Sequence, residues 1–345
     1  MKKLLSFMFL LCFLSVCFML CGFTFFKKEA KPEKTNSVEN SVIKEKLWCT
    51  TFQLVWNDFM DNINKGKPVE FVNGNPPIAD ELNKRLYTES ILSSDSYYKK
   101  YGLISKSLRK TIEDGIKKQF NEKSDILNLI DWNAENSYLF YVMLIKDFNF
   151  EVAFDELKSS TFNGSEEKVK YFGIDKKSNK RLKGNVDVLF YNSADDYAVK
   201  LLTKENEEVI LLRSEKNDSF ENLYTYIEEN TKFDEFREKD ELKIPNINVD
   251  ELIKYDELCN KPIKDSNYVI SQALQTIKFK MDNKGGKLKS EAAIIAVKTA
   301  LFPPIDNSPR FFMFDKKFVL FLKEAEKDKP YYAMKVDDTS FLVKD

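Results

Sequence analysis

The feature that most constrains this chain is a long, largely uncharged segment between two strand-like runs. The first run, residues 277–281, alternates apolar side chains with lysines, which is the pattern of a strand with one buried face. The following segment, residues 290–300, carries only Glu291 and Lys298 as charges. It ends at Phe302-Pro303-Pro304, where the fixed φ angles of proline exclude regular structure. Because long connections inside a compact domain are uncommon and usually functional, we expect this segment either to be buried or to become buried.

The N-terminal residues predict export of the chain. Lys2-Lys3 precedes an uncharged run, residues 4–26, which is long enough to span a bilayer. A basic start and an apolar run also describe a secretory signal. Cys21-Gly22 makes a lipoprotein signal a third reading, although Met19-Leu20 is bulkier than such signals favour. We therefore predict that residues 1–26 are a signal peptide or membrane anchor, and that the protein is secreted or tethered to the outer face of the cell membrane.

The next segment, residues 27–46, predicts a flexible tether. It is rich in Lys, Glu, Asn and Ser, so it buries too little apolar surface to offset the entropy of ordering it. The remaining residues, 47–345, are within the size of one large α+β domain. We expect this domain to be a monomer.

The composition argues against several classes of function. The 54 basic and 55 acidic residues nearly cancel and are interspersed, so nucleic acid is an unsuitable partner. The chain contains 0 histidines, which removes Ser-His-Asp and Cys-His nucleophiles and His-ligated zinc. Carboxylate pairs and a Ser-Lys couple remain open, but no phosphate-binding loop, Cys-x-x-Cys or acidic metal loop is present. We therefore predict no enzyme activity, no catalytic residue, no metal and no cofactor. Outside the leader only Cys49 and Cys259 occur, which allows one disulfide but no disulfide scaffold.

Apolar periodicity predicts both helices and strands. Stripes at three- and four-residue spacing indicate amphipathic helices over 47–63 and 107–121. The apolar run 137–145 predicts a fully buried strand, and 198–202 with 209–212 predicts a hairpin. The mixture of separate helices and antiparallel strands favours an α+β fold.

In their order along the chain, these segments resemble the serpin family. In that family, a strand leads through a hinge of small residues into an exposed reactive loop and back into a buried strand. Ser290-Glu291-Ala292-Ala293 resembles the hinge, with Lys289 where the family usually has Gly. Residues 314–322 and 332–336 resemble the strands that follow the loop. The colinear similarity extends over residues 108–336 and includes Asp125-Ile-Leu-Asn-Leu, Phe150, Phe154, Thr161-Phe162 and Leu242 to Val249.

The resemblance implies a serpin-like α+β fold with a large mixed central β-sheet, a second antiparallel sheet and surface helices. It also implies an exported inhibitor of a serine or cysteine endopeptidase, whose reactive-loop-like segment, 289–310, inserts into the central sheet after cleavage. The hinge would comprise Lys289, Ser290, Glu291, Ala292, Ala293, Ile294 and Ile295. The candidate bait residues are Lys298, Thr299, Ala300, Leu301 and Phe302.

The sequence also departs from the serpin pattern. The region before Leu108 is shorter than in the family, and the Asn and His that latch the main sheet are not evident. Small hinge residues insert most easily into a packed sheet, yet either Ile294 or Ile295 must face inward. If Gly286 instead marks the start of the hinge, Lys287 and Lys289 occupy positions that need small residues, and we expect poor insertion. Two alternatives therefore stay open: a serpin-fold binding or structural protein whose loop does not insert, and an unrelated α+β protein whose uncharged segment is a buried crossover.

Overall fold

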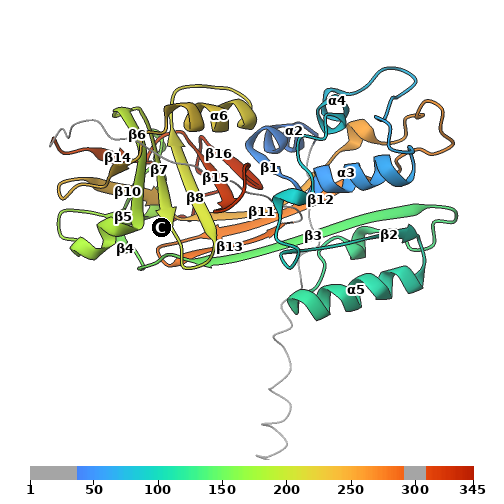
Figure 1. The fold of residues 1–345 in the computed structure, drawn as a ribbon, viewed down its shortest axis with the longest axis horizontal. Coiled ribbons are helices and arrows are strands. Elements are labelled where there is room, and N and C mark those ends of the chain that lie inside the picture. The colour runs from blue at the N-terminus through green and yellow to red at the C-terminus, as the bar shows by residue number, and fades with distance from the viewer. Residues whose placement is uncertain (1–36, 291–307) are drawn as a thin grey trace, which may run out of the picture. The chain divides into compact units, whose positions relative to one another are not determined.

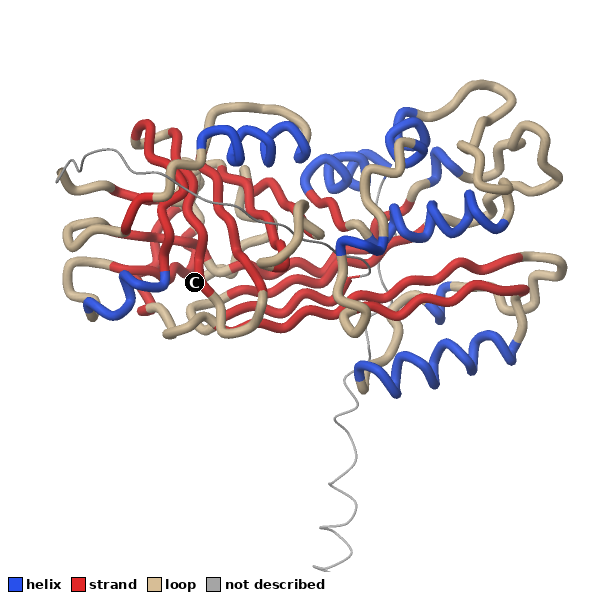
Figure 2. Tube along the Cα trace, viewed as in Figure 1, coloured by secondary structure: helices blue, strands red, loops and turns tan. Residues whose placement is uncertain are grey.

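The structure is a computed structural model that describes residues 37–290 and 308–345 (Figure 1). Within these ranges the chain forms three sheets with helices on their outer faces, which confirms the predicted α+β class (Figure 2). The α-helices are α2 (Ser37–Lys46), α3 (Thr51–Asn62), α4 (Pro77–Asn83), α5 (Lys106–Phe120) and α6 (Phe220–Asn230).

The 7-stranded sheet is antiparallel between every pair of neighbours. Helix α6 covers one face, where Leu223 and Ile227 pack with Phe321, and the other face contributes Leu320 and Leu322 to the main core. This burial on both faces explains the continuous apolar run of β15. In sheet order the strands are β1 (Leu47–Cys49), β16 (Tyr332–Val336), β15 (Phe318–Glu324), β8 (Glu207–Arg213), β7 (Asp196–Leu202), β6 (Val186–Ser193) and β9 (Asp234–Glu235).

The 5-stranded sheet is also antiparallel throughout and lies between two helices. Figure 1 shows α3 on one side of β3 and α5 on the other. On the α5 side, Ile112 and Ile116 pack with Met143, whereas on the α3 side Phe59 contacts the edge of Phe140. In order, the strands are β11 (Ile247–Lys254), β12 (Leu274–Met281), β13 (Gly285–Ser290), β3 (Tyr138–Asn149) and β2 (Tyr97–Leu103).

The 4-stranded sheet contains the one parallel pair among the described strands, β10 with β14. Its order is β14 (Phe311–Met313), β10 (Glu241–Pro245), β5 (Lys168–Ile174) and β4 (Asp155–Thr161). Since β14 is the first strand after the undescribed segment, the chain leaves the 5-stranded sheet at Ser290 and re-enters the fold in a different sheet.

Several predicted elements are confirmed. Helix α5 matches the predicted helix 107–121. Its N-terminus is capped by the Ser105 side chain, which accepts a hydrogen bond from the Leu108 amide at 3.1 Å. It ends at Asn121, which has a left-handed φ of 54°. Strand β3 and the β7–β8 hairpin also lie where the sequence predicts them.

The predicted tether and first helix need correction. Residues 37–46 of the predicted tether form α2 instead, so the folded domain begins at Ser37 rather than at Leu47. The reason is tertiary contact: Ile43 is buried, and the Asn40 side chain bonds to both backbone polar groups of Lys254. The helix predicted for residues 47–63 begins with strand β1, because Leu47–Cys49 pairs with β16, and becomes helical only from Thr51.

Two further expectations concern the cysteines and the membrane. Cys49 and Cys259 are not joined by a disulfide in this structure. None of the helices in the described part of the chain combines the length and apolar character needed to cross a bilayer. The predicted leader, residues 1–26, lies outside the described residues.

Candidate functional site

Strand β13 contains the first residues of the predicted hinge and lies inside the 5-stranded sheet. It pairs antiparallel with β12 on one side, where Lys278 faces Lys289, and with β3 on the other, where Leu144 faces Ser290. The strand begins at Gly285, and only glycine fits there, because a Cβ would lie 2.1 Å from the Phe148 carbonyl oxygen. Lys289 and Ser290 are thus ordinary strand residues. The other predicted hinge residues, Glu291 to Ile295, and the bait candidates Lys298 to Phe302 lie outside the described residues.

The two faces of β13 have different environments. Leu288 and Ser290 face the main core and are 0% and 1% exposed. Lys287 and Lys289 point to the opposite face, as strand alternation requires. In the uncut chain the sheet therefore accommodates both lysines on the face away from the core. That a hinge starting at Gly286 would insert poorly after cleavage stays a prediction.

Acidic residues after α5 pair with the lysines of β13. The Lys289 ammonium lies 3.0 Å from Asp125 and donates to the Lys123 carbonyl at 2.7 Å. Lys287 lies 3.2 Å from Glu122, and Lys278 of β12 lies 3.1 Å from the other oxygen of Asp125. Burial alone would raise the pKa of Asp125, but its hydrogen bonds to and charge attraction by Lys289 and Lys278 lower it. We call Glu122, Asp125, Lys278, Lys287 and Lys289 the β13 clamp.

A cavity continues the line of β13 beyond Ser290, and we call it the slot. Within the described ranges, β12 has a β13 partner only from Lys278 onward, and β3 has one only from Leu144 onward. A cavity of about 320 Å³ is lined by Tyr138–Val142 of β3 and by Leu274 of β12. Its walls come from α3 and the following Ile63, from Ile126 and Ile130 after α5, from residues 136–142, and from residues 267–274. None of the lining residues carries a charged side chain.

A buried polar cluster stands where β13 ends and the slot begins. Gln275 of β12 is 4% exposed, and its amide donates to the Thr51 hydroxyl at 2.6 Å and to the Cys49 carbonyl at 2.9 Å. The Tyr255 hydroxyl donates to the side-chain amide oxygen of Gln275 at 2.8 Å, and the Thr51 and Ser290 hydroxyls lie 3.4 Å apart. This uncharged cluster joins α3, β12 and β13. The sequence did not reveal it, since amides and hydroxyls are common and these are far apart in the chain.

Arg310 anchors the chain where it returns to the fold. Its guanidinium is buried and donates to Asp240 at 2.7 and 3.1 Å, to Asp234 at 2.6 Å and to the Glu235 carbonyl at 2.6 Å. The Asp240 side chain is 0% exposed, so this pair is fully enclosed. Arg310 thereby fixes the position of β14, which begins at the next residue. Sequence analysis missed this anchor because its acidic partners belong to a distant segment.

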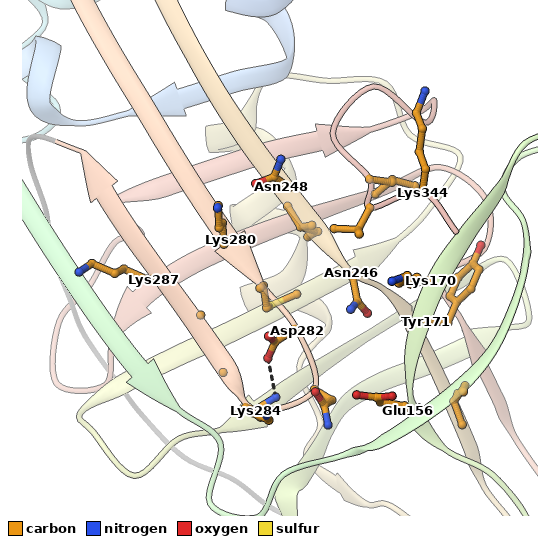
Figure 3. A pocket seen from close by; sticks show the side chains of 18 of the residues that line it. Glu156, Lys170, Tyr171, Asn246, Asn248, Lys280, Asp282, Lys284, Lys287 and Lys344 are labelled. Carbon is orange, nitrogen blue, oxygen red and sulfur yellow. Dashed lines mark hydrogen bonds between the residues drawn. The ribbon is translucent and has the colours of Figure 1, made fainter. Parts of the chain in front are cut away.

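A larger cleft lies at the β12–β13 turn (Figure 3). It has a volume of about 1130 Å³ and is lined by residues of β3, β4, β5, β12, β13 and the C-terminal segment. Figure 3 shows Lys170, Lys280 and Lys284 around it together with Glu156 and Asp282, so its charges are of both signs. The turn is held by a hydrogen bond from the Lys284 amide to the Asp282 carboxylate at 2.8 Å.

A buried charged network lies between the 5-stranded and the 7-stranded sheet. Lys146 of β3 contacts Glu207 of β8 at 2.6 Å and Glu324 of β15 at 2.5 Å, and Tyr331 donates to Glu207 at 2.7 Å. Two carboxylates thus share one buried ammonium. Burial raises the pKa of Glu207 to about 7, despite the opposing effects of Lys146 and Tyr331. The network ties the 5-stranded sheet to the 7-stranded sheet.

The described residues offer no metal centre. Across residues 37–290 and 308–345, no group of three or more His, Cys, Asp or Glu side chains is arranged to hold an ion.

Comparison with known proteins finds similarity at the level of structure. No protein-family model and no curated protein matches the sequence. Serpin48 from the insect Tenebrio molitor aligns with 86% of this chain and 93% of its own, at 14% identity and a TM-score of 0.46. Cleaved Serpin 42Da aligns over 68% of this chain and 66% of its own, at 13% identity and a TM-score of 0.45. Human thyroxine-binding globulin, complexed with thyroxine, aligns over 67% of this chain and 63% of its own, at 14% identity and a TM-score of 0.41.

Proposed function

We propose that this protein is an exported serpin-like inhibitor of a serine or cysteine endopeptidase, without enzyme activity of its own. The observation that carries the proposal is the slot. Strand β13 already lies between β12 and β3, and the uncharged cavity lies beyond its last residue, Ser290. The uncharged segment is the next part of the chain after Ser290. After a protease cuts the segment, its N-terminal part extends β13 into the slot, and a protease attached to it is carried along and distorted.

The strand registers define how the segment would enter. Continuing the β13–β3 ladder beyond Ser290 sets residues 291–296 opposite residues 143–138. Since Ser290 faces the core, alternation turns Ala292, Ile294 and Ala296 inward. These side chains are uncharged, as are the residues lining the slot. Filling an apolar cavity with apolar side chains stabilises the fold by roughly 25 cal/mol for each Å² removed from water.

The proposed scissile bond follows the inserting residues. Lys298-Thr299 and Leu301-Phe302 are the candidate bonds, whereas the Phe302-Pro303 bond resists most proteases. Cleavage at either candidate bond leaves residues 291–296 on the N-terminal fragment, so these residues remain able to insert.

The proposal is tested by incubating the protein with a panel of serine and cysteine endopeptidases. We expect at least one protease to lose activity and to form a complex that survives denaturing gel electrophoresis, because the acyl bond is trapped. Turnover of the chain as a simple substrate by every protease, with no inhibition and no trapped complex, would contradict the proposal.

A matched pair of variants tests the direction of insertion. Ala292→Lys places a charge at an inward position in an uncharged slot, and we expect it to reduce the rate of inhibition at least tenfold. Ala293→Lys places the same charge on the outward face, where Lys287 and Lys289 are already accommodated, and should change inhibition much less. Equal effects of the two variants would show that the extrapolated register is not used.

A second candidate function is that of a non-inhibitory serpin-fold binding or structural protein. It is favoured by β13 itself, because residues 285–290 already occupy the sheet in the uncut chain and are held by the β13 clamp. Less of the segment then remains to enter the sheet. Replacing Lys289 by Gly, and Ile294 and Ile295 by Ala, should create or accelerate inhibition if this reading holds.

We also propose that residues 1–26 direct export. Residues 4–26 are then either removed with the signal peptide by cleavage or retained as an anchor that tethers the protein to the outer face of the membrane. The support is the basic start and uncharged run of the sequence. Fractionation of expressing cells followed by N-terminal sequencing distinguishes a cleaved leader from a retained anchor. Protein that stays inside the cell with an intact N-terminus would contradict both.

A further inference from the structure

We infer that the slot is a binding site for a neutral aromatic ligand of about two rings. The site is the cavity itself in the uncut chain, and it is formed entirely by described residues. Its consequence for inhibition rests on the function proposed above, whereas ligand binding does not.

The lining of the slot defines the chemistry of the ligand. Although 32% of the residues in the chain are charged, none of those lining the slot is. A charged ligand would lose its hydration there without gaining a partner, so the site favours a neutral molecule. Aromatic side chains reach the cavity from three directions: Trp56 and Phe59 from α3, Phe140 from β3, and Tyr268 from the segment before β12. Such walls favour an aromatic ligand, which stacks or packs edge to face.

The size of the slot sets the size of the ligand. A cavity of about 150 Å³ in another protein holds one benzene ring. The slot has about 320 Å³, roughly twice that volume and at the lower end of the range of small-molecule pockets. It is too small for a helix of a partner protein, whose diameter with side chains is about 10 Å.

The rim of the slot carries exposed apolar and aromatic side chains beside the exposed polar residues Asn136, Asn267, Ser271 and Gln272. Tyr138, Tyr268 and Val269 line the cavity and are 39%, 40% and 54% exposed. Tyr138 and Tyr268 meet edge to face, with ring centroids 5.9 Å apart. Exposed apolar side chains beside an uncharged cavity are typical of a ligand entrance, because isolated exposed hydrophobic residues rarely cluster around one opening.

A ligand in the slot would oppose strand insertion. Both would occupy the space between β12 and β3, so by thermodynamic linkage each lowers the affinity of the protein for the other. The ligand would therefore hold the inhibitor in its uncut arrangement.

The test uses the neutral two-ring fluorescent probe 1-naphthylamine with the chain lacking residues 1–26. All described core clusters lie within Ser37–Asp345, so this chain keeps every described core contact. We expect saturable binding of one probe per chain, with Kd on the order of 10 μM. The anionic two-ring analogue 8-aminonaphthalene-1-sulfonate should bind this site at least tenfold more weakly.

Two variants and a control locate the probe. Ala273→Phe fills the slot from the half-buried residue that precedes β12, and Val55→Phe fills it from α3. Each should weaken probe binding at least tenfold in whichever variant keeps a cooperative melt. Val72→Phe adds the same side chain at a residue that is 60% exposed and away from the slot, so its affinity should match that of the parent chain. Equal binding by all three variants, or no binding to the parent chain, would overturn the inference.

Cleavage separates this inference from the proposed function. If the cut chain melts higher and releases the probe, both stand. If the uncut chain binds the probe and the cut chain still binds it without a rise in melting temperature, the ligand site stands and insertion fails. If the cut chain melts higher but the uncut chain never binds the probe, insertion stands and the ligand site is wrong.

Discussion

Glu207 and Lys146 show how single buried side chains set the pH response of this fold. Glu207 and Glu324 share one ammonium, and burial raises the pKa of Glu207 to about 7. The charged groups that face Glu207 are Lys146 from β3 and Glu324 from β15, together with the hydroxyl of Tyr331. Because the pKa of Glu207 is higher in the folded state than its ordinary value of 4.5, this group stabilises the fold most below pH 4.5. That contribution is lost as the pH rises toward 7.

Glu207→Gln should remove this pH dependence. Relative to the parent chain, the variant should gain unfolding free energy between pH 4.5 and pH 8, by on the order of 3 kcal/mol. Urea denaturation of both proteins across this pH range measures the difference. Glu326→Gln, at an exposed glutamate nearby, should follow the parent chain at every pH. A constant difference between Glu207→Gln and the parent chain would contradict the assignment.

Arg310→Ala should destabilise the fold strongly. It removes the guanidinium from Asp240, whose side chain is 0% exposed, and leaves a buried carboxylate without its counterion. Loss of one partner from a buried pair typically costs about 3–5 kcal/mol. Chemical denaturation measures this value. Lys316→Ala breaks a pair in which both side chains are more than half exposed and should cost less than about 1 kcal/mol; similar costs for the two variants would show that Arg310 is no anchor.

Strand β13 illustrates what a single element gains from its neighbours. Its sequence, Gly-Gly-Lys-Leu-Lys-Ser, has only one large apolar residue and two lysines, so its own preference for a strand is weak. Pairing on both edges and the acidic residues Glu122 and Asp125 stabilise it. The β13 clamp thus adds to the strand pairing that holds residues 285–290 in the sheet.

Asp125→Asn should loosen β13 locally. The pKa of Asp125 is lowered in the fold, so its stabilising effect is present above its ordinary value of 3.8 and is lost as the pH falls through the lower, folded value. At pH 7 we expect amide hydrogen exchange in residues 285–290 to accelerate about fivefold, which corresponds to about 1 kcal/mol.

The control for this prediction is Asp250→Asn. Asp250 also faces Lys278, but at 3.7 Å and with 67% of its side chain exposed, so exchange in β13 should barely change. If Asp125→Asn accelerates exchange equally in β8 and β13, its effect is global and the local clamp is refuted.

Elements with a strong internal pattern could be predicted from the sequence. Helix α5 has a regular apolar stripe with a serine cap, and β3 is a long apolar run, so local information suffices for both. Helix α2 and strand β1 could not be predicted in this way. The burial of Asn40 and Ile43 and the pairing of Leu47 with Met334 depend on residues more than two hundred positions away.

The same contrast applies to the whole molecule and its candidate site. The uncharged segment between two strands pointed to the region of the site, and the order of motifs pointed to an α+β fold with several sheets. The slot and the Gln275 cluster arise only when β12, β3 and α3 come together. The Arg310 anchor arises only when residues 234–240 meet the start of β14. The sequence also did not reveal how Lys287 and Lys289 are accommodated in β13, because their partners Glu122 and Asp125 are distant in the chain.

At the scale of the molecule, no described strand pairs with the β13-facing edges of β12 before Lys278 and of β3 before Leu144. We propose that residues 291–296 take this strand position after cleavage. The most direct test is to cut the chain lacking residues 1–26 between residues 297 and 302 and to compare its thermal melt with that of the uncut chain. We predict that the cut chain melts at least 10 °C higher, because residues 291–296 fill the slot and bury apolar side chains. The same cut in the Ala292→Lys variant should produce a smaller rise. A cut chain that melts at or below the temperature of the uncut chain would contradict the claim.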